Sequence, residues 1–391
     1  MVNWRPTQST MIYLDNNATT PVAAEVREAM LRCLSDNFGN PSSAYGIGQE
    51  ARRTVDKARQ SVASLIGAGS PDEIVFTSCG TESDNWAILG ALQARPGKKH
   101  IISTTVEHDA VRKTLQSMEA SGYTITWLEV DNEGKLDLDE LRDGLNSDTA
   151  LVTVMLANNE TGILFPVEEI GRIVRGNSDA LFHVDGVNAV GKVPIDLSSS
   201  EIDLFALSAH KFHGPKGIGA LYIRHGVHLE PHLIGGGQEQ GRRSGTEAVH
   251  QLAGLGVAAE LAADLAPMEG VRSLRDHLET KILDKIPNSR LNGTSDPSMR
   301  LPNTSSISFA NVNGEMILDR LDRLGICVST GSACNAAGHT ASPVLAAMDI
   351  PYSYAMGSIR FSLGRFNTQN EIDYVLGALT DIMSDLVSLS S

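Results

Sequence analysis

The fold is decided by three neighbouring stretches, ALFHVD (180–185), DLFALSAHKFHGPKG (203–217) and GALYI (219–223). Each contains a short apolar run rich in β-branched or aromatic residues, which predicts a buried strand. Further runs of this kind are EIVFTS (73–78), HIISTT (100–105), TITWLEV (124–130) and ALVTVMLA (150–157). Helical patterns, such as those of 81–94 and 166–176, lie between many of them. This alternation predicts an α/β fold whose largely parallel sheet is covered on both faces.

The C-terminal part of the chain has a different pattern. A long helical stretch (250–285) is followed by shorter strand-like and helical segments, namely SSISFA (305–310), 313–324, ICVST (326–330), SIRFSL (358–363) and 369–388. We interpret this part as a smaller α+β domain that the N-terminal strand joins. Because 391 residues are many for one compact core, we predict a large domain at 21–264 and a small domain made of 1–20 and 265–391.

Composition limits the classes of function and location. The 32 basic and 47 acidic residues give a net charge of −15. This charge disfavours direct binding of nucleic acid, which uses a surplus of Lys and Arg. No stretch approaches the ~20 apolar residues of a membrane helix. The start of the chain has no signal-peptide pattern, and the scattered cysteines make no disulfide framework. We therefore expect a cytoplasmic protein without membrane contact.

Lys211 and Asp185 each come at the end of a predicted strand. Strand ends in an α/β sheet face the crevice where ligands bind. Desolvation there would lower the pKa of Lys211, and a neutral amine can form a Schiff base. A carboxylate such as Asp185 can keep a pyridinium nitrogen protonated. The alternatives are a surface lysine in a turn and an aspartate that forms a turn or caps a helix. The pair favours pyridoxal phosphate as the cofactor.

The segment TSCGTES (77–83) joins a strand to a helix and predicts a phosphate site. Gly80 allows the backbone to approach an anion, and Thr81 adds a hydroxyl. Free N–H groups and the helix dipole favour a phosphate at such a helix start. The alternative is an ordinary N-cap by Ser78 or Thr81, which is compatible with the phosphate site.

His108 follows another predicted strand. An imidazole at that edge could stack on a cofactor ring or move protons. The chain has 11 histidines, so a structural or surface role is the alternative for any one of them. The neighbouring candidates favour a role for His108 in the site.

Cys334 lies in the small, polar run STGSACNAAGHT (329–340). Reactive cysteines occupy accessible places of this kind, whereas buried ones are inert. A flexible segment would let the thiol meet a substrate and then deliver its cargo elsewhere. Cys33, Cys79 and Cys327 have apolar or tight-turn settings, for which we expect packing roles.

Metal binding is a second use for these cysteines. Cys327, Cys334 and His339 do not form a recognised zinc spacing. A dedicated internal metal site is therefore not expected. Transient ligation of an iron–sulfur cluster by Cys334, shared with a scaffold partner, stays open.

With these motifs, nearly the whole chain resembles the group I cysteine desulfurases of the NifS/IscS type, which are fold-type I pyridoxal-phosphate enzymes of the class V aminotransferase family. The resemblance rests on YLDNNATT (13–20), FGNPSS (38–43), FTSCGTESDN (76–85), ANNETG (157–162), HVDGVNAVGKVPIDL (183–197), SAHKFHGPKG (208–217), RRSGTE (242–247), GSAC (331–334) and SIRFSLGR (358–365). The long loop after Cys334 resembles the NifS type more than the SufS type. The resemblance implies a large, mostly parallel-sheet domain and a smaller α+β domain that carries Cys334.

The resemblance also implies roles in holding pyridoxal 5'-phosphate. Lys211 would attach the cofactor covalently, Asp185 would pair with its ring nitrogen, and His108 would stack on its face and take part in catalysis. The phosphate would be bound by Gly80, Thr81, Ser208 and His210. Thr246 would reach in from a second subunit, which implies a homodimer.

The substrate and the sulfur have implied sites as well. Asn159 would contact both the cofactor and the substrate. Asn159 and Arg360 would bind the substrate carboxylate, which an arginine fork suits. Cys334 would be the nucleophile that becomes a persulfide.

The chain departs from the family pattern in two places. Asn188 stands where the family usually has glutamine beside the phenolic oxygen of the cofactor. Asparagine is one methylene shorter, so this hydrogen bond would be longer or bridged by water. The run NAAGHTAS (335–342) after Cys334 also differs, and we expect this run to contact the acceptor protein.

The implied activity is removal of sulfur from L-cysteine, giving L-alanine and a persulfide on Cys334 that passes to sulfur acceptors, with iron–sulfur cluster assembly as the expected use. The alternatives are a selenocysteine lyase and a sulfur donor for tRNA or DNA thiolation. Two other rival functions are an aminotransferase and a non-catalytic scaffold with the same fold. An aminotransferase needs no thiol, and a scaffold would need neither Lys211 nor Cys334. Both residues are present.

Overall fold

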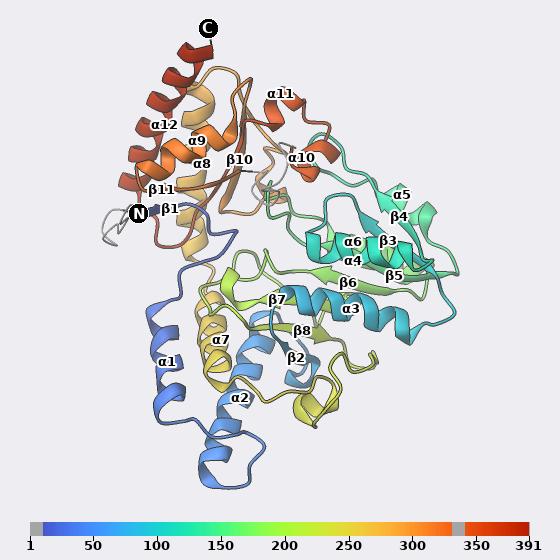
Figure 1. The fold of residues 1–391 in the computed structure, drawn as a ribbon. Coiled ribbons are helices and arrows are strands. Elements are labelled where there is room, and N and C mark those ends of the chain that lie inside the picture. The colour runs from blue at the N-terminus through green and yellow to red at the C-terminus, as the bar shows by residue number, and fades with distance from the viewer. Residues whose placement is uncertain (1–10, 331–340, 391) are drawn as a thin grey trace.

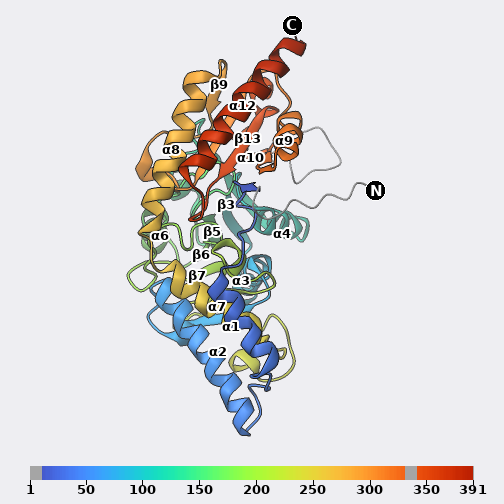
Figure 2. The ribbon, with the colours of Figure 1, turned by 90° about the vertical axis from the view of Figure 1, so that its left-hand side faces the viewer.

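The computed structural model describes residues 11–330 and 341–390. The molecule is elongated (Figures 1 and 2). Helix α12 (Gln369–Ser390) lies at one end, and the loop that precedes helix α2 (Gly46–Leu65) lies at the other. Between them lies a twisted central sheet. A second, smaller sheet belongs to the C-terminal part of the chain.

Within the described residues, the central sheet has seven strands. In spatial order they are β2 (Ile74–Thr77), β8 (Gly219–Ile223), β7 (Leu204–Ser208), β6 (Leu181–Asp185), β5 (Thr149–Met155), β3 (His100–Thr104) and β4 (Thr124–Leu128). Only β8 runs antiparallel to its neighbours β2 and β7. The prediction of an α/β fold with a largely parallel sheet is therefore confirmed.

Helices cover both faces of this sheet because successive strand residues point to opposite sides. Leu181 and Leu204 pack under helices α3 (Gly80–Ala94) and α4 (Asp109–Ala120). The next residues, Phe182 and Phe205, belong to the core of the opposite face. That core includes side chains of α1 (Ala24–Ser35), α2, α5 (Leu138–Gly144), α6 (Val167–Asn177) and α7 (Val249–Ala262).

The C-terminal part has a core of its own. Its antiparallel sheet has the spatial order β12 (Ser329–Thr330), β13 (Ser358–Ser362), β10 (Thr304–Phe309) and β9 (Ser289–Leu291). The other elements here are α8 (Pro267–Lys285), α9 (Gly314–Arg323), α10 (Pro343–Ala347), α11 (Tyr352–Ala355) and α12. The short strand β1 (Ile12–Tyr13) pairs in parallel with β11 (Ile326–Cys327), so the N-terminal segment packs here. The domain boundaries stay a prediction.

The prediction of a single long helix at 250–285 is wrong. The structure divides it into α7, which ends at Ala262, and α8, which begins at Pro267. Proline is favoured in the first turn of a helix, where its missing N–H costs no hydrogen bond. Pro267 therefore starts a new helix instead of lying inside a long one.

Candidate active site

The carboxyl ends of β2, β3, β5, β6 and β7 meet at one edge of the central sheet, as parallel strands require. A cavity of about 280 Å³ opens at this edge. It is lined by nine of the residues that the sequence singled out: Gly80, Thr81, His108, Asn159, Asp185, Asn188, Ser208, His210 and Lys211. Residues far apart in the sequence are therefore brought to one place by the strand order.

Lys211 ends the short 3-10 helix η2 (Ala209–Lys211), which follows β7 directly. Its Nζ donates hydrogen bonds to the backbone oxygens of Asn17 and Ala18. The N-terminal turn therefore supplies two acceptors for the amine of a residue that lines the cavity. A lysine that is positioned in this way can act as a nucleophile or move a proton.

Asp185 ends β6, is buried and lines the same cavity. Its Oδ1 accepts a hydrogen bond from the backbone N–H of Val187 at 2.9 Å. Burial raises the pKa of this carboxyl group, while the positive charges of His108 and Lys211 act in the opposite direction. A cationic N–H donor that contacts Asp185 would stabilise its ionised form.

Two further buried acids lie around Asp185, and sequence reasoning missed both. Asp84 of α3 lines the cavity, and its Oδ1 is 3.5 Å from Nε2 of the buried His183. Burial raises the pKa of Asp84 well above its usual range and lowers that of His183 to about 3. Burial also raises the pKa of Glu107 to about 8. Burial therefore favours the uncharged form of each of these groups, while the charges of His108 and Lys211 favour the ionised form of Asp185.

The start of α3 provides an anion site. The helix begins at Gly80 after Cys79, and no described side chain caps it. The expected alternative of a cap by Ser78 or Thr81 is therefore wrong. A Cβ at position 80 would lie 2.7 Å from Cγ2 of Val187, so only glycine fits between the cavity and its wall.

The side chains opposite this helix start complete the anion site. The Oγ of Ser208 is buried and has no hydrogen-bond partner among the described residues. Burial, together with Lys211, Lys216 and Lys192, lowers the pKa of His210 to about 4, so its imidazole is neutral. Its Nδ1 lies 3.1 Å from Oγ1 of Thr19. An uncapped helix start and an unpartnered hydroxyl fit a phosphate group.

His108 is the N-cap of α4. Its Nδ1 accepts a hydrogen bond from the backbone N–H of Ala110 at 3.1 Å. The ring therefore carries its proton on Nε2 when it is neutral. The cap gives His108 a structural role and leaves its ring at the cavity wall, where its functional role stays a prediction.

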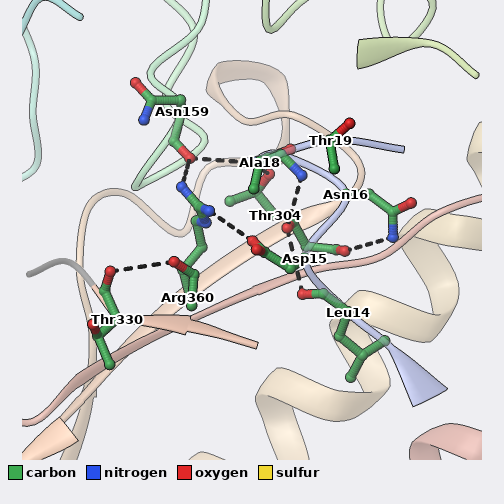
Figure 3. A network of polar contacts seen from close by, with 12 residues as sticks. Leu14, Asp15, Asn16, Ala18, Thr19, Asn159, Thr304, Thr330 and Arg360 are labelled. Carbon is green, nitrogen blue, oxygen red and sulfur yellow. Dashed lines mark hydrogen bonds and ion pairs between the residues drawn. The ribbon is translucent and has the colours of Figure 1, made fainter. Parts of the chain in front are cut away.

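Arg360 lies on β13 and contacts Asn159, a residue that lines the cavity (Figure 3). Its Nη1 donates to the backbone oxygen of Asn159 at 3.0 Å, and its Nη2 donates to Oδ1 of Asp15 at 2.7 Å. Its Nε is buried without a described acceptor. Arg360 pairs with Ser329 across β12 and β13. Cys334 follows β12 in the sequence and lies outside the described residues.

Thr246 does not line the cavity of its own chain. It borders a separate cavity of about 110 Å³ with Gly217, Arg243 and Glu247 among its neighbours. Arg243 forms a double ion pair with Glu82 in the first turn of α3, with N–O distances of 2.8 and 3.1 Å. The loop with Thr246 is thereby fixed to the outside of the anion site.

The cavity fits a phosphorylated pyridine. The uncapped start of α3 and the Ser208 hydroxyl suit the phosphate, Asp185 suits a protonated ring nitrogen, and Lys211 suits an aldehyde.

None of the described helices has the length and apolar character needed to cross a membrane.

Comparisons with known proteins identify relatives of the whole chain. The family model described as "Aminotransferase class-V" matches residues 12–375. A protein of Trichormus azollae named "Cysteine desulfurase" is 52% identical over 383 residues, which cover 97% of this chain and 94% of that protein. "Cysteine desulfurase NifS" of Azotobacter vinelandii is 49% identical and covers 97% and 94%. A solved structure titled "NIFS-LIKE PROTEIN" superposes with a TM-score of 0.90 at 40% identity, covering 96% of this chain and 100% of that one.

Proposed function

The chain belongs to the class-V aminotransferase family, and we propose that it is a pyridoxal-phosphate-dependent cysteine desulfurase. In this reaction L-cysteine becomes L-alanine, and its sulfur becomes a persulfide on Cys334. The observation that carries the proposal is one cavity in which Lys211, Asp185 and the uncapped start of α3 lie together. Relatives of about 50% identity that bear the name cysteine desulfurase support it.

Pyridoxal phosphate is the cofactor that these residues would hold. When bound, it supplies a carbonyl that condenses with amines and a ring that accepts electrons. Ser208 and the N–H groups at the start of α3 would bind its phosphate, and Asp185 would pair with its ring nitrogen. Thr81 and His210 belong to the phosphate site in this proposal, and His108 would stack on the ring.

Lys211 has two roles, to attach the cofactor and to move the proton of the substrate α-carbon. The backbone oxygens of Asn17 and Ala18 accept from its Nζ, so they stabilise the amine after it takes up that proton. Arg360 and Asn159 orient the substrate through its carboxylate. The Nε2–H of His108 is available as a proton donor at the cavity wall.

Cys334 receives the sulfur. Its thiolate attacks the sulfur of the substrate and forms an S–S bond as the C–S bond breaks. The electron pair of the broken bond goes to the β-carbon, which takes up a proton and becomes the methyl group of alanine. One thiol and one cysteine therefore give one persulfide and one alanine, without an external oxidant or reductant.

The destination of the sulfur is a separate part of the proposal. We propose transfer to a sulfur-acceptor or iron–sulfur scaffold protein, for cluster assembly, as the names of the relatives suggest. Selenocysteine cleavage and sulfur donation to tRNA or DNA modification are the alternatives. A homodimer with Thr246 in the neighbouring site, transient ligation of a cluster by Cys334 and a cytoplasmic location stay predictions.

Labelling of the lysine tests the function. The purified protein is expected to absorb as a pyridoxal-phosphate enzyme and, after borohydride reduction, to carry the cofactor on the peptide with Lys211. L-Cysteine is expected to give alanine and, with a thiol reductant, sulfide in equal amounts. Lys211→Ala abolishes both results, while exposed Lys285→Ala preserves them. A protein that takes up no added pyridoxal phosphate would end the proposal.

A further inference from the structure

Lys192 is a buried lysine that the reaction does not use. It lies one turn after Asn188, in the helical turn that follows β6, and only 7% of its surface is exposed. No carboxylate forms an ion pair with it among residues 11–330 and 341–390. A buried amine without an acid partner is costly, so its position requires an explanation.

The contacts of Lys192 are centred on Asn188. Its Nζ donates to the backbone oxygen of Asn188 and to the side-chain Oδ1 of Asn188, both at 2.8 Å. A third contact, at 3.3 Å, is to Oδ1 of Asn17. The two shorter contacts therefore hold the main chain and the side chain of the same residue.

These contacts fix which way the Asn188 amide faces. A lysine nitrogen in these contacts acts as a donor, so the amide must turn its oxygen toward Lys192 and its NH₂ away from it. The Nδ2 is 3.4 Å from the backbone oxygen of Asn158, a long contact that uses one N–H at most. Asn188 lines the cavity around Lys211. Its other N–H is therefore available to a group bound there.

We propose that Lys192 is a positioning residue that fixes the Asn188 amide so that its N–H donates to the phenolic oxygen of the bound cofactor. The inference rests on the proposed function and deepens it. It explains how asparagine serves at a position where the family usually has the longer glutamine. The short side chain has few orientations, and Lys192 selects the one with the donor in the cavity.

The charged groups that face Lys192 do not disturb this arrangement. Burial lowers the pKa of Lys192 well below its usual range, and the positive charges of Lys211 and Arg360 act in the same direction. The imidazoles of His210 and His213 are its other titratable neighbours. Every described contact of its Nζ is to an oxygen atom, two on Asn188 and one on Asn17, and these oxygens accept from its N–H groups.

The test is a pH titration of the cofactor absorption in the holoenzyme. Lys192→Met removes the donors with little change in volume. Loss of a hydrogen bond to the phenolic oxygen leaves more electron density beside the imine nitrogen. We therefore expect the spectroscopic pKa of the bound cofactor to rise by about one unit. Lys285→Met, at an exposed position in the last turn of α8, is the matched control and leaves the spectrum unchanged.

A double-mutant cycle separates positioning from other effects. Asn188→Ala is expected to give the same spectral shift as Lys192→Met, and the two together no further shift. A shift from Lys192→Met that persists in the Asn188→Ala protein would mean that Lys192 acts by its charge. A lower unfolding temperature without a spectral shift would mean that it is only structural. Either outcome overturns the inference.

Two further results keep the test decisive. If Lys192→Met does not fold, Lys192→Gln is used, because its shorter amide cannot hold both Asn188 oxygens, and the same shift is expected. If the wild-type protein binds no pyridoxal phosphate, the proposed function fails. If it binds the cofactor and turns over cysteine while no Lys192 variant shifts the spectrum, only the role of Lys192 fails.

Discussion

The Nη2 of Arg360 donates to Oδ1 of Asp15 at 2.7 Å, so the arginine assigned to the substrate carboxylate already holds a carboxylate of its own chain (Figure 3). Backbone hydrogen bonds fix the position of Asp15 relative to β13. Ser362 donates to the backbone oxygen of Leu14 and accepts from the backbone N–H of Asn16. The side chain of Asp15 is 20% exposed, and that of Arg360 is 10% exposed. Asp15 therefore both orients the guanidinium and competes for its charge.

Substitutions of Asp15 separate these two effects. Asp15→Asn keeps an oxygen that accepts from Nη2 and removes the competing charge, so we expect the KM for L-cysteine to fall about threefold with little change in kcat. Asp15→Ala also loses the orientation, and we expect KM to rise about tenfold. Steady-state kinetics with the exposed control Asp36→Asn check both. A KM that rises in Asp15→Asn would show that the charge supports Arg360 instead of competing with it.

Cys334→Ala should separate the two halves of the reaction. Cofactor attachment and proton removal at the α-carbon need no thiol, so the absorption change on adding L-cysteine should persist. Sulfide and alanine formation should fall by about 100-fold or more, because no nucleophile remains to take the sulfur. The matched variants Cys33→Ala, Cys79→Ala and Cys327→Ala should keep substantial turnover. Cys79 lines the cavity, so its variant is expected to hold the cofactor more weakly. Turnover at the wild-type rate in Cys334→Ala would replace the persulfide mechanism with a plain lyase.

The Thr246 loop predicts a composite site in a homodimer. If Thr246 acts on the neighbouring subunit, a dimer of one Lys211→Ala chain and one Thr246→Ala chain contains one complete site. We expect sedimentation to give a dimer, and mixing and exchange of these two variants to restore a fraction of the wild-type activity at low cofactor concentration. No restoration after demonstrated subunit exchange would place Thr246 in its own subunit's site or outside the chemistry.

The same loop depends on the double ion pair between Arg243 and Glu82. Burial raises the pKa of Glu82, but hydrogen bonds from Arg243 and Ser78 outweigh it and lower the pKa below its ordinary value. Glu82→Gln should reduce the affinity for pyridoxal phosphate about tenfold, because the start of α3 loses its fixed partner. A cofactor titration measures this, with the exposed pair variant Glu28→Gln as the control. An unchanged affinity of Glu82→Gln for pyridoxal phosphate would show that Glu82 does not support the anion site.

Glu107 predicts a pH dependence of stability. Its Oε1 accepts from Oγ1 of Thr104 at 2.8 Å and from the backbone N–H of Met155 at 3.0 Å, and burial raises its pKa from 4.5 to about 8. For a group whose pKa is raised by folding, the stability it contributes is complete below pH 4.5 and is lost as the pH rises toward 8. Glu107→Gln keeps the acceptor oxygen and cannot ionise. Its free energy of unfolding should therefore exceed that of the wild type by a few kcal/mol near pH 9, on the order that such a shift implies.

Denaturant unfolding at pH 5, 7 and 9 measures this difference. The two proteins should be closest at pH 5 and diverge as the pH rises. A difference that stays constant with pH would mean that Glu107 does not ionise in this range.

Local stretches of sequence predict the layers of the fold and most residues of the candidate site. Short apolar runs specify buried strands, and parallel strands place their carboxyl ends at one edge, so residues such as Asp185 and Lys211 had to meet. The resemblance of the motifs added their implied roles. The break at Pro267 was also present in the sequence, as a proline in the first turn of α8.

Which groups surround these residues depends on packing between distant parts of the chain. Asp15 and Arg360 are 345 residues apart, and strand pairing alone brings them together. Asp84 has the sequence signature of a surface helix residue, yet packing of α3 on the sheet buries it beside His183. In the sequence, Lys192 has the context of an ordinary charged turn residue. Its burial against Asn188 depends on the elements around it. The strength of a charge or a hydrogen bond depends on the local solvent exposure, which no local stretch of sequence specifies.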